Sequence, residues 1–588
     1  MMQGDRRNRA NEKPNRRIFM MWLVLSAIFC AIGLQRILQS QFPDPDDVLR
    51  LVQIRDLLNG QSWFDLHQYR IDPPGGTLMH WSRLVDLPIA LVILLLTPLI
   101  GVSAAETAAL VAVPLLTLGA ILFFVGKLAW RLFDTTVAGF ACLSLGLLAP
   151  FVFQLQPMRI DHHGWQIFSI AFALWSISGR SPIKGGALAG LAMALGLTIS
   201  VEILPMVAAF GAVLALRWFG DHHQRWWLVA YMQALALGLV AAFFATRGIA
   251  DLAQHCDAVS PAHLGFFVIT AIGTGIIAAS PPLPRFLLIG VFALAAAAGL
   301  SFFALSSPGC VTTPFAQLDP AVHANWYERV LEGQPLWKQD LAQALPILVQ
   351  LLVALMVALA LRANTRDWLR VFWTEYALLL FASIVLSIFV WRSAAFAALL
   401  SAIPIGWLTV RLLLRLRVEA RLPAKLLSAL AIIIVLLPAT PVRLWQSAAA
   451  EEKIEPVLVR NSSCEIGKQA ALLDTLPAGT IFAPLDIGPA ILLESHHSVV
   501  ATGHHRAETA MRDVIVTFTG SSDEARRLVA GHGATYVALC TDLAEINLYS
   551  QGNPASFASQ LVNGIVPEWL EEVELGGPAE FKVWRVKP

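Results

Sequence analysis

Charge is scarce in this 588-residue sequence. Only 14% of the residues are Asp, Glu, Lys or Arg, whereas 56% are hydrophobic and the mean hydropathy is +0.63. An average soluble domain has about 25% charged residues, so the composition argues against an ordinary soluble protein and indicates a membrane protein. The formal net charge is +1, which gives no electrostatic reason to expect a nucleic acid as partner.

Cysteine is scarce as well. The six cysteines include no C-x-x-C pair, which excludes the common zinc-binding and thioredoxin-like cysteine motifs. Cys30 and Cys142 lie in apolar stretches, where a small buried hydrophobe is the usual role. The other four fall in segments that we place outside the membrane, where oxidising conditions permit two disulfides, Cys256–Cys310 and Cys464–Cys540. Spacing alone leaves both pairings open.

Apolar runs long enough, or nearly so, to cross about 30 Å of hydrocarbon recur down to about residue 440. The first run, Ile18–Leu34, follows a basic segment from Arg6 to Arg17. It resembles a signal peptide without a convincing cleavage site, so we expect an uncleaved first span. Thirteen spans are predicted: Ile18–Leu34, Thr107–Val125, Val137–Phe153, Gly164–Ser178, Gly185–Ile199, Ile203–Leu216, Trp226–Ala245, Leu264–Ala279, Phe286–Phe303, Leu345–Leu361, Ala377–Val390, Ala394–Val410 and Leu426–Leu437.

One further apolar stretch, Leu87–Gly101, decides the topology. If it does not span, the short loops rich in Lys and Arg fall on the side of the N-terminus, as the positive-inside rule requires. We therefore predict a surface-lying or re-entrant helix there. The loops 39–101 and 304–344 and the C-terminal part then share the outer side, which predicts a cytoplasmic N-terminus. We expect the membrane to be a bacterial inner membrane, with the C-terminal domain in the periplasm.

The C-terminal part changes in character. From about Ala448, short β-prone runs alternate with a helical stretch near Asp523–Gly531, which predicts a small α/β domain. The expected fold class is a polytopic α-helical membrane domain, 1–447, followed by a periplasmic α/β domain, 448–588.

Two outer loops carry carboxylates that could do chemistry. The first contains Asp44, Asp46 and Asp47, which could also be a solvated loop or a helix N-cap. The second contains Asp161 followed by His162 and His163, where a carboxylate and an imidazole at the mouth of a span could bind a divalent cation. His162 could equally be an interfacial residue without a ligand role.

Three more groups stand out near the membrane boundary. Glu202 lies where two apolar spans meet, so it is either functional or an interhelical polar contact. Glu332 begins a Glu-Gly-Gln-Pro element in the large outer loop, which could also belong to an amphipathic surface helix. Arg392 stands at the outer end of a span, where it either extends to lipid headgroups or binds a phosphate.

Taken in order, these pieces resemble the GT-C membrane glycosyltransferases, most of all the oligosaccharyltransferase catalytic subunit. Asp44-Pro45 with Arg50 matches that family's first-loop motif, and Asp161-His162-His163 matches its second acidic motif with His163 in place of a carboxylate. Glu332-Gly333-Gln334-Pro335 matches its Glu-x-Gln-Pro element, and Arg392 resembles its phosphate-binding arginine. The resemblance implies Mn²⁺ or Mg²⁺ bound by Asp44, Asp161 and His163.

The acceptor motif of that family is altered here. Its Trp-Trp-Asp-Tyr-Gly run aligns with Pro484-Leu485-Asp486-Ile487-Gly488, which keeps the Asp and Gly but lacks the aromatic residues. Recognition of Asn-x-Ser/Thr is therefore not supported. Asp486, Gly488, His504 and His505 are candidates for a different acceptor site, although the neighbouring histidines could also form an exposed turn.

The resemblance implies an enzyme that transfers sugar from a polyprenyl-phosphate donor to a glycan, lipid or protein acceptor, with inversion. Arg392 would bind the donor phosphate, and Asp44, Asp46 or Glu332 would orient or deprotonate the acceptor. The alternatives are a protein N-glycosylating oligosaccharyltransferase, an inactive scaffold, and a transporter or lipid flippase. The polar groups of a transporter should concentrate at the bilayer midplane rather than in outer loops.

Overall fold

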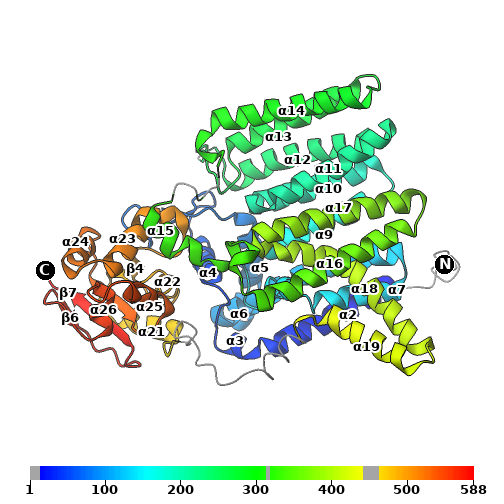
Figure 1. Cartoon of the computed structure of the whole chain (residues 1–588). Helices are drawn as coiled ribbons and strands as arrows, with labels where there is room; N and C mark the ends of the chain where they lie inside the picture. The colour runs from blue at the N-terminus through cyan, green and yellow to red at the C-terminus, as the bar shows by residue number, and fades with distance from the viewer. Residues whose placement is uncertain (1–12, 250, 313–314, 316–317, 441–461) are drawn as a thin grey trace. The chain divides into compact units, whose positions relative to one another are not determined.

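The computed structural model describes residues 13–249, 251–312, 315, 318–440 and 462–588 (Figure 1). Arg6, Arg7, Arg9 and the predicted domain boundary after residue 447 lie outside the described residues. The chain forms two compact units. Unit 1 consists of Met1–Gln39, Ser82–Pro314 and Leu331–Ala449, and unit 2 consists of Ser40–Trp81, Phe315–Val330 and Ala450–Pro588.

Unit 2 includes segments of both large loops, which the sequence analysis had placed in the membrane domain. Ile71 forms a parallel bridge with Val499. The Arg70 guanidinium donates hydrogen bonds to carbonyl oxygens at and beyond the C-terminal end of α22 (Gly488–Glu494), including that of Ser495 at 2.7 Å. The last carbonyls of a helix have no partner within it, so Arg70 stabilises the helix end and holds the first loop on this unit.

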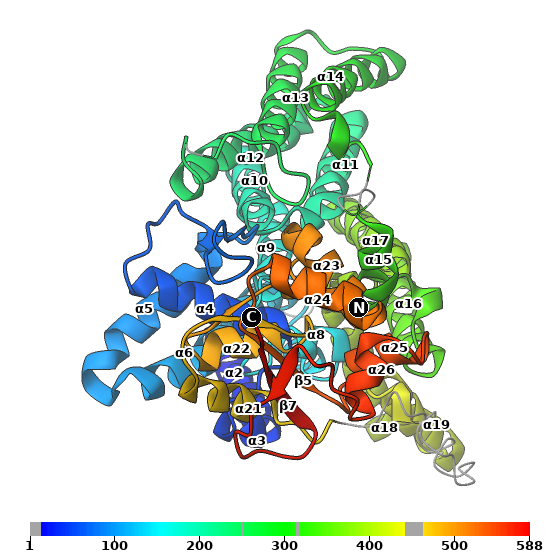
Figure 2. The same cartoon turned by 90° about the vertical axis from the view of Figure 1, so that its left-hand side faces the viewer.

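Unit 1 is a bundle of long helices, in which α12, α13 and α14 pack side by side, as do α16 and α17 (Figure 1). Figure 2 shows α13 and α14 as the outermost pair at one edge, and α14 buries only Leu288 and Gly299. The helices of unit 1 are α2 (Pro14–Ile32), α3 (Leu34–Leu38), α5 (Arg83–Ile100), α6 (Val102–Leu132), α7 (Thr135–Leu145), α8 (Ala149–Phe153), α9 (His163–Ile177), α10 (Pro182–Ile199), α11 (Leu204–Gly220), α12 (Arg225–Thr246), α13 (Pro261–Ala279), α14 (Arg285–Ser306), α16 (Leu341–Ala363), α17 (Asp367–Phe389), α18 (Ala394–Val418) and α19 (Leu422–Leu436).

Among the described residues, eleven helices are long and apolar enough to cross a membrane, and α7 and α19 are shorter apolar helices. The polytopic helical fold is thus confirmed. One predicted span, Val137–Phe153, is wrong as a continuous helix because it is divided into α7 and α8. The break falls at Gly146, a poor helix former, and Pro150 then stands in the first turn of α8, where proline is tolerated.

The apolar stretch Leu87–Gly101, which decided the predicted topology, forms most of α5. This 18-residue helix packs along α6 and contains Pro88 and Pro98. It is long and apolar enough to be a span. Gly101 separates α5 from α6 and has φ 79°, a left-handed conformation that glycine adopts without a steric penalty. The surface-lying position of this helix stays a prediction.

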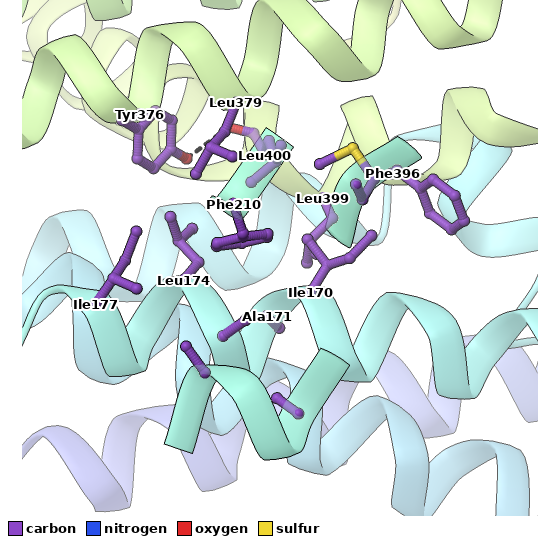
Figure 3. Close-up of a cluster of buried hydrophobic side chains, with 14 of the residues drawn as sticks. Ile170, Ala171, Leu174, Ile177, Phe210, Tyr376, Leu379, Phe396, Leu399 and Leu400 are labelled. Atoms are coloured by element: carbon purple, nitrogen blue, oxygen red, sulfur yellow. Dashed lines mark hydrogen bonds between the residues drawn. The ribbon is translucent and has the colours of Figure 1, made fainter. Parts of the chain in front are cut away.

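The core of unit 1 packs α9 against α11, α17 and α18 (Figure 3). Ile170, Leu174 and Ile177 follow one another along α9 at helical spacing, and Phe210 and Leu399 face them from neighbouring helices. These side chains are at most 3% exposed. The phenol of Tyr376 donates a hydrogen bond to the Leu400 carbonyl oxygen in the same cluster, so the polar end of this buried ring is satisfied. This packing fixes α9, which begins at the candidate residue His163 and directly follows Asp161 and His162.

Unit 2 is an α/β unit, as predicted. Its five-stranded sheet has the order β4-β3-β5-β7-β6; β3 pairs in parallel with β4 and β5, whereas β7 pairs antiparallel with β5 and β6. The elements are α4 (Pro45–Leu58), β1 (His67–Gln68), β2 (Thr77–Leu78), α15 (Pro320–Asn325), α21 (Ile466–Leu472), β3 (Thr480–Phe482), α22 (Gly488–Glu494), β4 (Ser498–Val499), α23 (Glu508–Thr519), α24 (Ser522–Gly531), β5 (Tyr536–Cys540), α25 (Ala544–Gln551), α26 (Phe557–Val562), β6 (Leu570–Glu572) and β7 (Phe581–Val586).

Both disulfides that the sequence permitted are present. Cys256–Cys310 joins two loops of unit 1, and Cys464–Cys540 joins the start of the C-terminal part to β5 in unit 2. Cys30 and Cys142 are free, and Cys142 is buried. Disulfides persist in oxidising compartments, which supports an outer location for the segments that carry them.

Candidate functional site

The site in unit 1 begins in the short connection between α8 and α9. Met158 has φ 71° and is fully buried. Its N–H donates a hydrogen bond of 3.0 Å to the Leu110 carbonyl oxygen of α6. A non-glycine residue in this left-handed region is strained, so packing against α6 holds the connection in one shape. That shape sets the position of Asp161, three residues further on.

Asp161 accepts hydrogen bonds from two imidazoles. Its Oδ1 lies 2.5 Å from His162 Nδ1, and its Oδ2 lies 2.7 Å from His163 Nδ1. The two rings stack with centroids 4.2 Å apart, and Arg159 Nη2 lies 3.5 Å from Asp161 Oδ2. Burial opposes ionisation of Asp161, but the charges and hydrogen bonds of the two histidines outweigh it and hold its pKa well below the usual value. Asp161 is therefore ionised, and both of its oxygens accept hydrogen bonds.

Glu202 faces the other side of both rings. It lies in η1 (Val201–Ile203), between α10 and α11. Its Oε2 is 3.7 Å from His162 Nε2 and 3.5 Å from His163 Nε2. Both Nε2 atoms are buried, and neither has a hydrogen-bond partner among the described residues. Burial opposes the charge of His163, but Asp161 and Glu202 raise its pKa to about 10. Without a cation its Nε2 therefore carries a proton that faces Glu202, and a cation bound here would replace that proton.

This arrangement fits a divalent cation. Ligands about 2.0–2.2 Å from one ion stand roughly 3–3.5 Å from one another, close to the separations of the two Nε2 atoms from Glu202. Histidines that bind a metal usually donate their other ring N–H to a carboxylate, as His162 and His163 do to Asp161. In this geometry Asp161 orients the two imidazoles as well as being a possible ligand. His162 and Glu202 join the ligand set that the sequence predicted.

Arg392 extends the network to the large loop. It belongs to η7 (Trp391–Ser393), and its Nη1 lies 3.1 Å from Glu202 Oε1 and 3.5 Å from Glu332 Oε1. The Trp391 N–H donates a hydrogen bond of 3.1 Å to the Gln334 carbonyl oxygen, which ties the loop to η7. A Cβ on Gly333 would lie 2.7 Å from Arg392 Nη2. A Cβ at this position would therefore displace the end of the Arg392 side chain, and glycine permits the close approach between the Glu-Gly-Gln-Pro element and the guanidinium.

Unit 1 thus brings together four residues that the sequence predicted: Asp161, His163, Glu332 and Arg392. The sequence did not assign a role to His162 or link Glu202 to the other groups. The signal for Glu202 was present, because a carboxylate at the junction of two apolar helices is costly to keep without function or a partner. No sequence pattern showed that Glu202 faces residues about 40 positions earlier.

Asp44 and Asp46 lie at the start of α4 in unit 2. Asp44 is the N-cap of α4, and its Oδ1 accepts the Asp46 N–H at 3.0 Å. The capping role that the sequence left open is therefore real. Asp47 and Arg50 are fully buried, and Arg50 lies over the Trp81 ring at 4.8 Å. The acidic cluster is a folded part of unit 2, which excludes the solvated-loop interpretation.

Asp486 lies in the turn before α22 and interacts with Asp44. Burial and the charge of Asp44 both raise the pKa of Asp486. The N–H groups of Leu485 and Asp486 donate to the two carboxylate oxygens of Glu545 at 2.8 and 2.9 Å. Unit 2 therefore brings the predicted residues Asp44 and Asp486 into one electrostatic group, with Glu545 as a member that the sequence did not reveal.

His504 and His505 do not form an exposed turn. His504 is 2% exposed, and its Nε2 lies 2.9 Å from His80 Nδ1. His505 stacks on His504 with ring centroids 5.3 Å apart and also contacts Phe315. The buried His497 is structural, because both of its ring nitrogens contact backbone carbonyl oxygens. Three imidazoles and an aromatic ring thus form one cluster in unit 2.

Solved structures identify this architecture. No family model and no curated protein matches the sequence. The archaeal oligosaccharyltransferase AglB from Archaeoglobus fulgidus, in complex with an inhibitory peptide and a dolichol-phosphate, matches with a TM-score of 0.63 and 13% identity over 94% of this chain and 72% of that chain. The chain has the GT-C fold of the oligosaccharyltransferases.

Two further structures of an Archaeoglobus fulgidus oligosaccharyltransferase agree with this match. One is tethered to an acceptor peptide with an NVT sequon; it has a TM-score of 0.60 and 12% identity over 97% of this chain and 74% of that chain. The other is a complex with Zn and sulfate; it has a TM-score of 0.57 and 14% identity over 96% of this chain and 73% of that chain. The TM-scores establish the oligosaccharyltransferase fold, and at identities this low they establish nothing beyond the fold.

Gly488 opens α22, in the segment that the sequence analysis compared with the acceptor motif of the oligosaccharyltransferases. A Cβ there would lie 2.7 Å from the Ala501 carbonyl oxygen and 3.0 Å from Thr502 Cγ2. We expect Gly488→Ala to destabilise unit 2 by about 1–3 kcal/mol because backbone must move to admit the methyl group. Thermal unfolding of the purified full-length protein measures the effect. Gly467→Ala is the control, since a Cβ there meets nothing within 4 Å.

Glu545 makes the stability of unit 2 depend on pH. Burial and the charge of Asp486 raise its pKa from 4.5 to about 8. Below pH 4.5 the carboxyl is protonated in the folded and the unfolded chain alike. Between pH 4.5 and 8 the folded state keeps a proton that the unfolded state has released, so the free energy of unfolding falls as the pH rises.

We therefore expect a lower thermal midpoint at pH 8 than at pH 5, and a smaller difference between these midpoints in Glu545→Gln. The exposed Glu571→Gln is the control, and it should keep the wild-type dependence. Equal pH dependence in wild type and Glu545→Gln would contradict the assignment.

Proposed function

We propose that this protein is a membrane glycosyltransferase that moves a sugar or oligosaccharide from a polyprenyl-phosphate donor to an acceptor on the outer side of a bacterial inner membrane. The observation that carries the proposal is the chain of interacting groups that runs from the buried Asp161, His162 and His163 to the partly exposed Glu202 and Arg392. These groups lie at helix ends rather than in the middle of spans, which argues against a transporter.

Arg392 is proposed to bind the donor phosphate. A guanidinium offers five N–H groups in a planar fork that suits phosphate oxygens. Glu202 and Glu332 hold it from one side through Nη1, so a phosphate would contact it elsewhere. As the bond between the anomeric carbon and the phosphate oxygen breaks, negative charge grows on the leaving phosphate, and Arg392 would stabilise that charge. Attack from the opposite face of the sugar would invert the anomeric centre.

A divalent cation is proposed to assist at the same phosphate. His162, His163 and Glu202 would hold it, with Asp161 fixing the two rings, and when bound it would supply Lewis-acid stabilisation of the leaving group. Imidazole nitrogens suit Mn²⁺ or Zn²⁺ better than Mg²⁺, which prefers oxygen ligands. One related structure is a complex with Zn and sulfate, which supports a metal in this fold. The contribution of Asp44 as a ligand stays a prediction.

We propose that carboxylates bind and activate the acceptor nucleophile. Glu332, Asp44 or Asp46 would orient or deprotonate its nucleophile. Asp486, Gly488, His504 and His505 are the proposed acceptor residues of unit 2. Because Pro484 and Leu485 stand where the oligosaccharyltransferases have two tryptophans, a sequon peptide lacks its aromatic wall. We therefore favour a glycan or lipid acceptor over a protein.

A deletion strain tests the function. The lipid-linked intermediates and surface glycans of the deletion strain are analysed by mass, with wild type and Asp161→Asn supplied on plasmids. Accumulation of a polyprenyl-linked sugar together with loss of a surface glycan, restored by wild type alone, is expected. Loss of one decorating residue indicates single-sugar transfer, and loss of a glycan block indicates en bloc transfer. Unchanged lipids and glycans would reject the proposal, and glycosylation of a sequon peptide by purified protein would favour the oligosaccharyltransferase reaction.

A further inference from the structure

A second polar site lies at the far end of α9 from Asp161. The 15 residues of α9 span about 22 Å at a rise of 1.5 Å per residue. A cavity of about 100 Å³ lies at its C-terminal end, between α6, α9 and α10. It is thus separated from the proposed transfer site by the length of a buried helix, and it does not depend on the proposed reaction.

Three cations line this cavity: Arg131 of α6, Arg180 of the α9–α10 loop and Lys184 of α10. Among the described residues, the lining includes neither Asp nor Glu. Like charges gathered without a carboxylate repel one another, and an anion placed among them removes that repulsion. The cavity therefore has the charge pattern of an anion site.

The neighbouring Arg217 shows the contrasting arrangement. It donates hydrogen bonds to both carboxylate oxygens of Glu375 and to the carbonyl oxygen of Ile177, at the same end of α9. The protein thus supplies an internal carboxylate to one arginine at this face. The lining of the cavity supplies no carboxylate to its three cations. An external anion would provide the negative charge that Glu375 provides to Arg217.

The cavity also offers oriented hydrogen-bond donors. Arg131 Nη1 donates to Ser178 Oγ at 2.6 Å, and its guanidinium lies over the Trp175 ring at 5.5 Å, so the side chain is held in place. The buried indole Nε1–H of Trp175 has no hydrogen-bond partner among the described residues. A buried donor without an acceptor costs free energy. Because Trp175 lines the cavity, an anion bound there is the acceptor that we assign to this N–H. The N-terminus of α10, capped by Ser181, adds a favourable dipole.

We propose that this cavity binds a phosphate group. Arginine, lysine and an indole N–H suit a doubly charged or diester phosphate, and basic pockets between spans are typical binding sites of anionic lipid headgroups. Ile183, which is 63% exposed beside Lys184, offers apolar surface for an acyl chain. The same chemistry would accept free phosphate, so the experiment has to separate these two sources.

Lipid retention by the full-length protein in detergent tests the site. Delipidated wild type is exposed to phosphatidylglycerol or to phosphatidylcholine, and bound lipid is counted by native mass spectrometry. The pocket variant combines Arg131→Gln, Arg180→Gln and Lys184→Gln. The matched control combines Arg415→Gln, Arg417→Gln and Arg421→Gln, which removes the same charge from and beyond the end of α18, outside the cavity lining.

We expect wild type and the control to retain one phosphatidylglycerol that the pocket variant loses, with no such retention of phosphatidylcholine. Millimolar inorganic phosphate that raises the melting temperature of wild type and control, but not of the pocket variant, would assign the site to free phosphate. Trp175→Phe keeps the ring and loses the N–H, so it should weaken binding about 2- to 10-fold even if the triple variant folds poorly. Equal lipid loss in both triple variants, or undiminished binding in Trp175→Phe and the pocket variant, would overturn the proposal.

Discussion

Replacing Asp161 by Ala is expected to abolish sugar transfer, and Asp161→Asn is expected to lower it about 100-fold, the upper range for loss of a group that orients metal ligands. Asp161 accepts hydrogen bonds from the Nδ1 atoms of His162 and His163. An asparagine amide can accept only one of these bonds, and its NH₂ group opposes the other. At least one ring is then free to turn its Nε2 away from Glu202.

The measurement is transfer by purified protein from a lipid-linked donor, together with metal content after chelation and reloading. Reduced Mn²⁺ or Zn²⁺ binding should accompany the loss of transfer, which a general folding defect would not produce in a protein of normal melting temperature. Asp340→Asn is the control, because Asp340 caps α16 and asparagine is an equally good cap. Transfer by Asp161→Ala at the wild-type rate would refute the assignment of this carboxylate.

Replacing Arg392 by Lys is expected to lower transfer by roughly 10- to 100-fold, the range for one lost hydrogen bond between charged groups. A lysine keeps the charge but lacks the planar fork, so it cannot keep Glu202 and Glu332 in place and also contact a phosphate with two N–H groups. The apparent affinity for polyprenyl phosphate should fall by a similar factor, and it can be measured without turnover. Gly333→Ala should show the same defect more mildly because its Cβ displaces Nη2.

Arg247→Lys is the matched control for this variant. Arg247 also pairs with a carboxylate, that of Asp251 at 2.5 Å, in the segment that follows α12. It should keep wild-type transfer and wild-type affinity for polyprenyl phosphate. If Arg392→Lys binds the lipid phosphate as tightly as wild type does, Arg392 holds the loop rather than the donor.

Helix positions were predictable to the extent that apolar length determines them. Gly164–Ser178 was expected as a span, and α9 begins and ends one residue earlier than that range. The break between α7 and α8 was missed because Gly146 and Pro150 lie within an unbroken apolar run, and hydropathy does not report a change in chain direction. The C-terminal helix Asp523–Gly531 was predicted nearly to its ends, because Ser521 caps α24 and acidic residues fill its first turn.

The candidate site was predictable only in part. Asp161 and Arg392 were found because charged groups beside apolar spans are rare and costly, a property that can be read from the sequence. The pairing of Glu202 with both histidines was not predictable, since it depends on how the end of α10 meets the start of α9. For the same reason, no sequence pattern indicated that Glu545 holds the turn around Asp486.

Hydropathy and composition by themselves determined that this chain crosses a membrane many times as helices, because a segment in lipid must satisfy its own backbone hydrogen bonds. The short β-prone runs after about residue 448 likewise indicated the α/β unit. The tertiary structure decided which polar groups meet. Residues far apart in the sequence converge only through packing of helices and loops, and the hydrogen bonds that orient His162, His163 and Arg392 form only after that packing. Short-range sequence patterns hold no record of such contacts.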